Sequence, residues 1–104
     1  MPNATIVVDG NVSKDCFYEY IFTHFKKTDK TRADQYMFDI TDEDVDKLYE
    51  YAKNKLLEII HDKPIVFNIN VFYYNDDEKN LRDYKIDYSC GNVTRIRTTF
   101  EPKH

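Results

Sequence analysis

The two cysteines are the candidate nucleophiles for covalent catalysis in this sequence. The two cysteines, Cys16 and Cys90, form neither a Cys-x-x-Cys pair nor another metal-type spacing. A nucleophilic cysteine needs an oriented base, and the candidates are His24 and His61. Both cysteines fall in predicted buried positions, where free cysteine usually packs in the core. We therefore expect two reduced thiols and assign no catalytic residue; a secretory leader upstream would instead allow a Cys16–Cys90 disulfide.

Metal and phosphate sites have no better support in the sequence. Asp42, Asp44 and Asp46 alternate, but they do so at the start of a predicted helix, where N-capping and the helix dipole account for them. The acidic segment 76–78 has no glycine at the position that an EF-hand requires. Two glycines in the whole chain exclude a glycine-rich phosphate loop and the nucleotide-binding enzymes built on one. We predict no metal and no cofactor. A small enzyme with an unrecognised site remains one functional hypothesis, ranked behind protein binding and nucleic-acid binding.

The charge balance favours a protein partner over a nucleic acid. Fifteen Lys and Arg against nineteen Asp and Glu give a net charge of -4, whereas non-specific phosphate binding depends on basic residues. Nine Tyr and seven Phe supply large side chains that suit binding surfaces. Acidic proteins can bind basic partners by electrostatic steering combined with aromatic anchors. We assign the predicted partner-binding surface to Asp42, Glu43, Asp44, Asp46, Tyr49, Asp76, Asp77 and Glu78.

The leading hypothesis is therefore a small acidic protein-binding module. The chain is rich in Ile, Lys, Asn, Tyr and Phe, the residues of AT-rich codons, which indicates a phage, virus or plasmid of an AT-rich host, or such a host itself. We expect an inhibitor or immunity-type antagonist that occludes a basic, nucleic-acid-processing protein. The N-terminus lacks a signal-peptide pattern, and no apolar run reaches the roughly 18–20 residues of a membrane span. The expected location is the cytoplasm of the producing or host cell.

Nucleic-acid binding is the alternative hypothesis. Lys85, Arg95 and Arg97 are predicted to share the polar face of the last two strands, close to two aromatic residues of the preceding strand. Proteins that bind single strands combine basic residues with stacking aromatics in this way. The acidic total opposes this reading, and a cross-strand pair of Asp87 with Arg97 explains that arginine without a ligand.

The N-terminal half is predicted to contain two strands and two helices. Residues 5–8 are predicted as a strand, and a helix capped by Ser13 follows and runs to about Lys27. Residues 28–35 are almost wholly polar and predict an exposed loop, and the alternation of residues 36–40 predicts a second, mostly buried strand. The strongest local signal is the capping pattern of residues 41–44, which opens an amphipathic helix that ends near residues 60–62, before a proline.

The C-terminal half reads as three strands. Residues 65–74 alternate clearly, residues 75–80 form a polar connection, and residues 84–90 form a further strand. For the last turn we favour a three-residue loop at 91–93, because it sets Tyr88 opposite Ile96, whereas a two-residue turn at 91–92 mixes core and solvent residues. One long strand with a bulge at Gly91 remains the alternative.

The order of these elements predicts the fold. The sequence β-α-β-α-β-β-β favours an α+β, two-layer sandwich with a mainly antiparallel sheet and both helices on one face. At 104 residues the chain has the size of one domain, so we expect a single α+β domain over residues 1–104. An edge strand of such a sheet could pair in a homodimer.

Overall fold

The fold is described from a computed structural model, which places residues 3–59, 64–74, 81–89 and 91–100. The first six elements have the β-α-β-β-α-β order of the split βαβ motif, and a C-terminal hairpin follows them. The observed order thus contains one strand more than we predicted. The elements are β1 (Asn3–Gly10), α1 (Asp15–His24), β2 (Lys26–Arg32), β3 (Gln35–Asp39), α2 (Asp42–Glu58), β4 (Phe67–Tyr74), β5 (Leu81–Ser89) and β6 (Asn92–Phe100).

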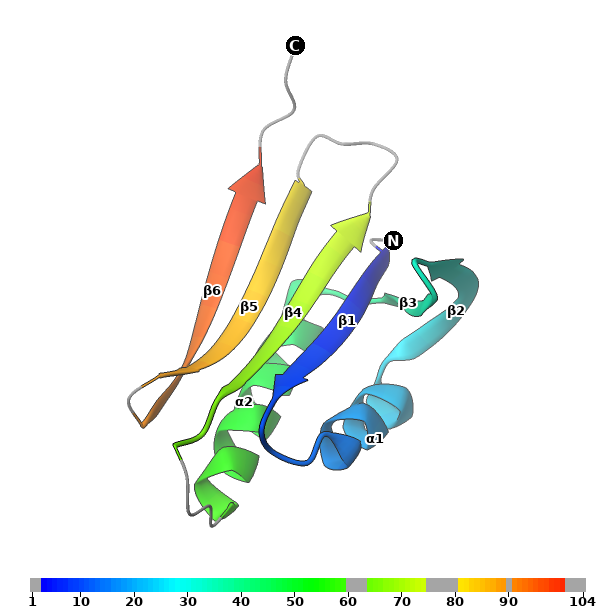
Figure 1. Cartoon of the computed structure of the whole chain (residues 1–104). Coiled ribbons are helices and arrows are strands. Elements are labelled where there is room, and N and C mark those ends of the chain that lie inside the picture. The colour runs from blue at the N-terminus through cyan, green and yellow to red at the C-terminus, as the bar shows by residue number, and fades with distance from the viewer. Residues whose placement is uncertain (1–2, 60–63, 75–80, 90, 101–104) are drawn as a thin grey trace.

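The six strands form one antiparallel sheet, and both helices cover the same face of it. The strand order is β2-β3-β1-β4-β5-β6, so β2 and β6 are the two edges (Figure 1). All five pairs of neighbouring strands are antiparallel. The predicted α+β sandwich of two layers is confirmed. Neither helix in the described part of the chain is long and apolar enough to cross a membrane.

The core lies between the helices and the sheet, and alternation along β4 determines which side chains enter it. Four of the five predicted inward residues lie in this strand and are confirmed, because at most 5% of each of their surfaces is exposed; the fifth, Ile65, lies before the strand and is half-buried. Asn68 and Asn70 lie on the opposite, uncovered face, where the Asn70 side chain donates a hydrogen bond to that of Asn68 at 2.8 Å. The inward residues of β4 are Phe67, Ile69, Val71 and Tyr73, and those of α2 are Val45, Leu48, Ala52 and Leu56.

The start of α2 confirms the predicted capping box. The Asp44 amide donates to the Thr41 hydroxyl at 3.2 Å, and the Thr41 amide donates to the Asp44 carboxylate at 3.0 Å. Two amides that the helix leaves without an intrahelical partner are therefore satisfied by side chains. The helix ends at Glu58, slightly before the predicted end. His61 lies outside the described residues.

Helix α1 is confirmed, but both of its predicted ends are wrong, since it ends at His24 and the last two residues assigned to it, Lys26 and Lys27, belong to β2. Lys14 occupies the N-cap position and makes no side-chain capping bond, so Ser13 lies one residue too early. Phe17 and Ile21 are buried at the predicted four-residue spacing. The chain becomes extended at Phe25, which is also buried, and β2 starts directly after it.

The predicted loop at residues 28–35 is wrong, because most of it is the edge strand β2 and the turn into β3. Ala33 and Asp34 form a two-residue turn with φ angles of 52° and 63°, the conformation that tight hairpins require. Every residue of β2 except Thr28 is exposed. A strand with neither face covered has no apolar alternation, so its sequence lacks the usual strand signal. The prediction of which β3 residues are buried is also partly wrong, since Tyr36 is exposed and Met37 is buried.

The predicted three-residue loop of the C-terminal hairpin is wrong as well. The pairing of Ser89 with Asn92 leaves two residues in the turn, at positions 90 and 91. Tyr88 consequently faces Val93, and Ile96 faces Lys85. Ile96 therefore lies on the uncovered face of the sheet, where 49% of its surface is exposed.

A glycine and an asparagine join the end of β1 to the segment before β4. The Asn11 side chain donates to the Pro64 carbonyl at 2.9 Å and accepts from the Val66 amide at 2.9 Å. Directly before it, Gly10 has a φ angle of 140°, and a Cβ atom there would lie 2.1 Å from the Val66 carbonyl oxygen. This close approach requires glycine.

Replacement of this glycine tests the junction. Gly10→Ala should lower the free energy of unfolding by about 3 kcal/mol or more, because backbone strain and a collision with the backbone add together. Gly91→Ala is the matched control: its φ angle is 84°, but the added Cβ meets no atom within 4 Å, so about 1–2 kcal/mol is expected. Urea unfolding followed by circular dichroism measures both. Equal losses would contradict the close approach at Gly10.

Candidate functional site

Several acidic residues predicted to bind a partner make contacts within the chain. The Asp44 carboxylate caps α2, Glu43 forms an ion pair with Lys47 at 3.7 Å, and Asp46 forms one with Arg95 of β6. Asp42 is exposed at the first position of the helix. The remaining predicted acidic residues, at positions 76–78, lie outside the described residues. The start of α2 is acidic and exposed, but part of its charge is balanced locally.

Tyr49, also assigned to the partner surface, joins α2 to the C-terminal hairpin. Its hydroxyl donates to the Val93 carbonyl at 3.2 Å, and its half-buried ring packs against the core. Together with the pair of Asp46 and Arg95, this bond holds the inner side of β6 against α2. Tyr49 therefore has a structural role.

The three basic residues of the nucleic-acid hypothesis do not share a face. Arg95 and Arg97 lie opposite Ile86 and Tyr84, which are buried under the helices, so both arginines lie on the helix-covered side of the sheet. Lys85 lies on the other side, opposite Ile96. The expected pair of Asp87 with Arg97 is also wrong, since Asp87 faces Thr94.

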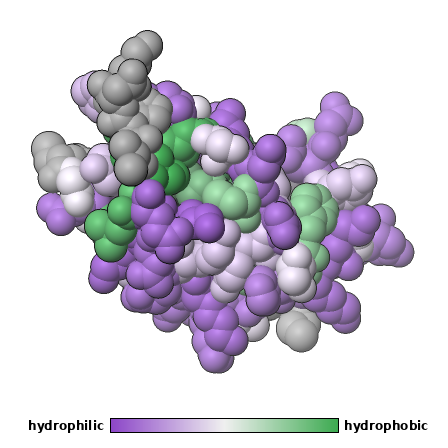
Figure 2. Space-filling view, turned by 90° about the horizontal axis from the view of Figure 1, so that it is seen from below, coloured by the Kyte–Doolittle hydropathy of each residue, from purple (hydrophilic) through white to green (hydrophobic). Residues whose placement is uncertain are grey.

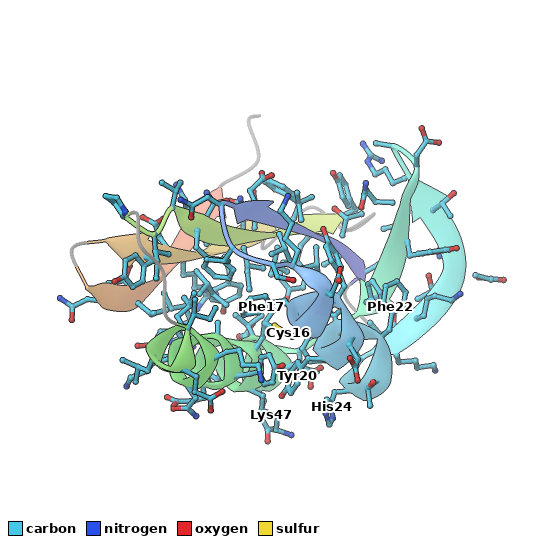
Figure 3. All side chains as sticks on the ribbon, turned by 60° about the horizontal axis from the view of Figure 1, so that its bottom comes forward. Cys16, Phe17, Tyr20, Phe22, His24 and Lys47 are labelled. Atoms are coloured by element: carbon cyan, nitrogen blue, oxygen red, sulfur yellow. The ribbon has the colours of Figure 1, made fainter. Side chains whose placement is uncertain are left out.

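The structure brings together two tyrosines on the helix layer, and the sequence did not indicate that they would meet. The rings of Tyr20 on α1 and Tyr51 on α2 stack with centroids 4.2 Å apart and an interplanar angle of 23°. The Tyr51 hydroxyl donates to the Cys16 carbonyl at 3.2 Å. Figure 3 shows Tyr20 and Lys47 on the side of the helices away from the sheet, with Phe17 closer to the sheet. We call Tyr20 and Tyr51 the tyrosine pair.

Two shallow depressions flank the tyrosine pair. One has a volume of about 450 Å³ and the other about 310 Å³, and both tyrosines line each of them. The first is also lined by Glu43, Asp46, Lys47 and Glu50, and the second by Cys16, Glu19, Thr23, His24 and Lys55. Seen from below in Figure 2, the surface is mostly hydrophilic, with hydrophobic residues in limited areas.

The second depression contains a cysteine and a histidine, but their spacing does not suit nucleophilic catalysis. Cys16 and His24 are eight residues apart on α1, which corresponds to about 12 Å along a helix axis. A nucleophile and its base must lie within about 3.2 Å, or be joined through one water. Tyr20 lies between them in the sequence, and the centroid of its ring is 4.3 Å from the centroid of the His24 ring. Among the described residues, no three His, Cys, Asp or Glu side chains gather as a metal site.

The environment of Tyr51 disfavours its ionised form. Desolvation by burial raises the pKa of Tyr51, and the nearby groups Cys16, Glu19 and Glu58 raise it further because they oppose a phenolate charge. Tyr51 thus stays neutral and keeps its hydroxyl donor throughout the physiological range. A neutral ring with carboxylates around it attracts cations.

This pKa shift predicts a difference in alkaline stability. Below the ordinary pKa near 10 the neutral form exists in both folded and unfolded chains, whereas above it the unfolded chain ionises first and the folded state loses stability. Tyr51→Phe should reduce the loss of unfolding free energy between about pH 9 and pH 11. Tyr36→Phe, at an exposed tyrosine, is the control. Identical pH profiles for the two variants in urea unfolding would refute the shift.

Comparison with other proteins adds no functional assignment. The sequence matches no protein-family model, and no curated protein and no solved structure is significantly similar to it. The split βαβ order is shared by proteins of many unrelated functions, so the fold by itself indicates none. The function must therefore be inferred from the surface.

Proposed function

We propose that the protein is a small acidic binding module that recognises a basic protein through the outer face of its helix layer. In this proposal it acts in the cytoplasm of the producing or host cell as an inhibitor or immunity-type antagonist of a nucleic-acid-processing protein. The observation that carries the proposal is the tyrosine pair with carboxylates along both sides. Both rings are half-buried, and partly accessible aromatic rings within a charged rim are typical of binding hot spots.

The charge around the tyrosine pair is negative. The two depressions are lined by four carboxylates and two ammonium groups, a net charge of -2. Two of these carboxylates, Glu43 and Asp46, form ion pairs within the chain. Glu19 and Glu50 form no ion pair among the described residues, so they are the carboxylates best placed for a cation from a partner.

The combination of rings and carboxylates fits an arginine or lysine side chain. The aliphatic stem of such a side chain can lie along a tyrosine ring while its charged end reaches a carboxylate. Within the chain, the Lys55 ammonium lies 5.9 Å from the Tyr51 ring centroid and 3.6 Å from the Glu58 carboxylate. A basic segment of a partner would make the same two contacts with the tyrosine pair and Glu50. This supports a basic protein as the partner.

Charge reversal tests the proposed surface. A short arginine-rich peptide should bind the wild-type protein, and Glu50→Lys should weaken it by about 3- to 10-fold, because one favourable charge pair becomes repulsive. Asp29→Lys is the matched control, since it makes the same charge change at an exposed position of β2. Fluorescence anisotropy at several salt concentrations gives both affinities. Equal weakening by the two variants would show that only the net charge matters.

The same pair of variants tests binding to natural partners. Wild type and Asp29→Lys should capture the same proteins from cells that encode the chain, and Glu50→Lys should lose them. A partner that all three forms capture equally would exclude the tyrosine pair as the binding surface. Tyr20→Leu keeps most of the apolar bulk and should also weaken capture if ring stacking contributes.

A further inference from the structure

We propose that β6 is a docking edge for an extended, acidic segment of a partner protein, which adds a further strand to the six-stranded sheet. This site uses the edge of the sheet and has the opposite charge preference, so it does not rest on the function proposed above, although Arg95 of β6 pairs with Asp46, which lines one depression beside the tyrosine pair. The inference comes from a comparison of the two edges of the sheet and from the charges along β6.

The β2 edge has the features that prevent strand addition. It contains three lysines, Lys26, Lys27 and Lys30, and its register with β3 shifts between Lys27 and Thr31. Lysines and register irregularities on an edge strand are devices by which proteins discourage pairing with another chain.

The β6 edge has no lysine and no register irregularity, and its charged residues are Arg95 and Arg97. Its nine residues pair with β5 in one unbroken register, from Ser89–Asn92 to Leu81–Phe100. The strand contains no lysine, no proline and no bulge, and residues 94–97 are all exposed. It is the last strand of the sheet, so one side of its backbone has no strand neighbour within the described part of the chain. Long and regular edges of this kind present backbone donors and acceptors to a further strand.

The side chains of β6 indicate which side chains an added strand should have. Arg95 and Arg97 lie on one face, and the exposed Ile96 lies between them on the other. Arg95 already pairs with Asp46, whereas Arg97 forms no ion pair among the described residues and lies 5.9 Å from the Tyr84 ring centroid. Cross-strand pairs of opposite charge stabilise a sheet. An added strand with two carboxylates flanking an apolar residue would therefore match β6 on both faces.

A second copy of this chain fits less well. Two β6 strands paired antiparallel about Ile96 would place Arg95 of each copy opposite Arg97 of the other. Pairing about either arginine would place that residue opposite itself. Like charges directly opposite each other destabilise a sheet, so the charges of β6 disfavour the self-pairings centred on residues 95–97, whereas an acidic strand would meet Arg97 with a favourable charge.

A peptide probe tests this site directly. A short peptide with two glutamates flanking a valine should bind, and Arg97→Glu should weaken it by about 3- to 30-fold. Lys85→Glu is the matched control, since it reverses an exposed charge on the neighbouring strand β5 and should change the affinity by less than about 2-fold. A peptide with lysines in place of the glutamates should bind more weakly than the acidic peptide. Equal affinity of the two peptides would overturn the charge assignment.

Backbone pairing is tested on the wild-type protein, so the result does not depend on a variant that folds. Alternate amides of an added strand point toward β6, so N-methylation of one alternating set in the peptide should abolish binding, and methylation of the other set should not. Equal effects of the two sets would exclude strand addition. Sedimentation of the protein alone should show a monomer, and a dimer that the acidic peptide dissociates would overturn the choice of partner in favour of a second copy.

Discussion

The burial of one face of a twisted antiparallel sheet under two helices is the constraint on which the rest of the structure depends. Alternate residues of β4, from Phe67 to Tyr73, meet the apolar stripe of α2, and this contact fixes which side of every strand is inside. A shift of one residue in β4 would bury Asn68 and Asn70. Because register propagates through hydrogen-bonded neighbours, the same constraint decides that Arg95 and Arg97 lie on the helix side of β6.

Function is then confined to surfaces that this packing leaves exposed. The helix layer presents the tyrosine pair and unpaired carboxylates on its outer side, while β6 presents an edge with arginines. In these two proposals the surfaces would prefer ligands of opposite charge, although the whole chain carries a net charge of -4. A partner that has both a basic surface and an acidic extended segment could engage the module at two places, and the affinities would then reinforce each other.

Elements with strong local signals could be predicted from the sequence, and elements defined by tertiary contacts could not. The capping box at Thr41 and the alternation in β4 are local and were predicted correctly. The polar strand β2 has no covered face, so no pattern revealed it. The register predicted for β6 was wrong because the inward face of this strand lies at the rim of the core. Arginines occupy that face instead of apolar residues, so the strand has no apolar alternation to indicate its register. The tyrosine pair depends on how two helices meet, which periodicity within either helix does not show.

The attachment of the C-terminal hairpin has a consequence for local stability. On its inner side β6 is held to α2 mainly by the Tyr49 hydroxyl and the Asp46 carboxylate, and β5 is its only strand neighbour in the described part of the chain. Such a strand should open more readily than β1 or β4, which have neighbours on both sides, and its amide protons should exchange with solvent earlier. A ligand bound to β6 would suppress this opening. Binding at this edge of the sheet could therefore be measured as slower exchange of the amide protons along the whole hairpin.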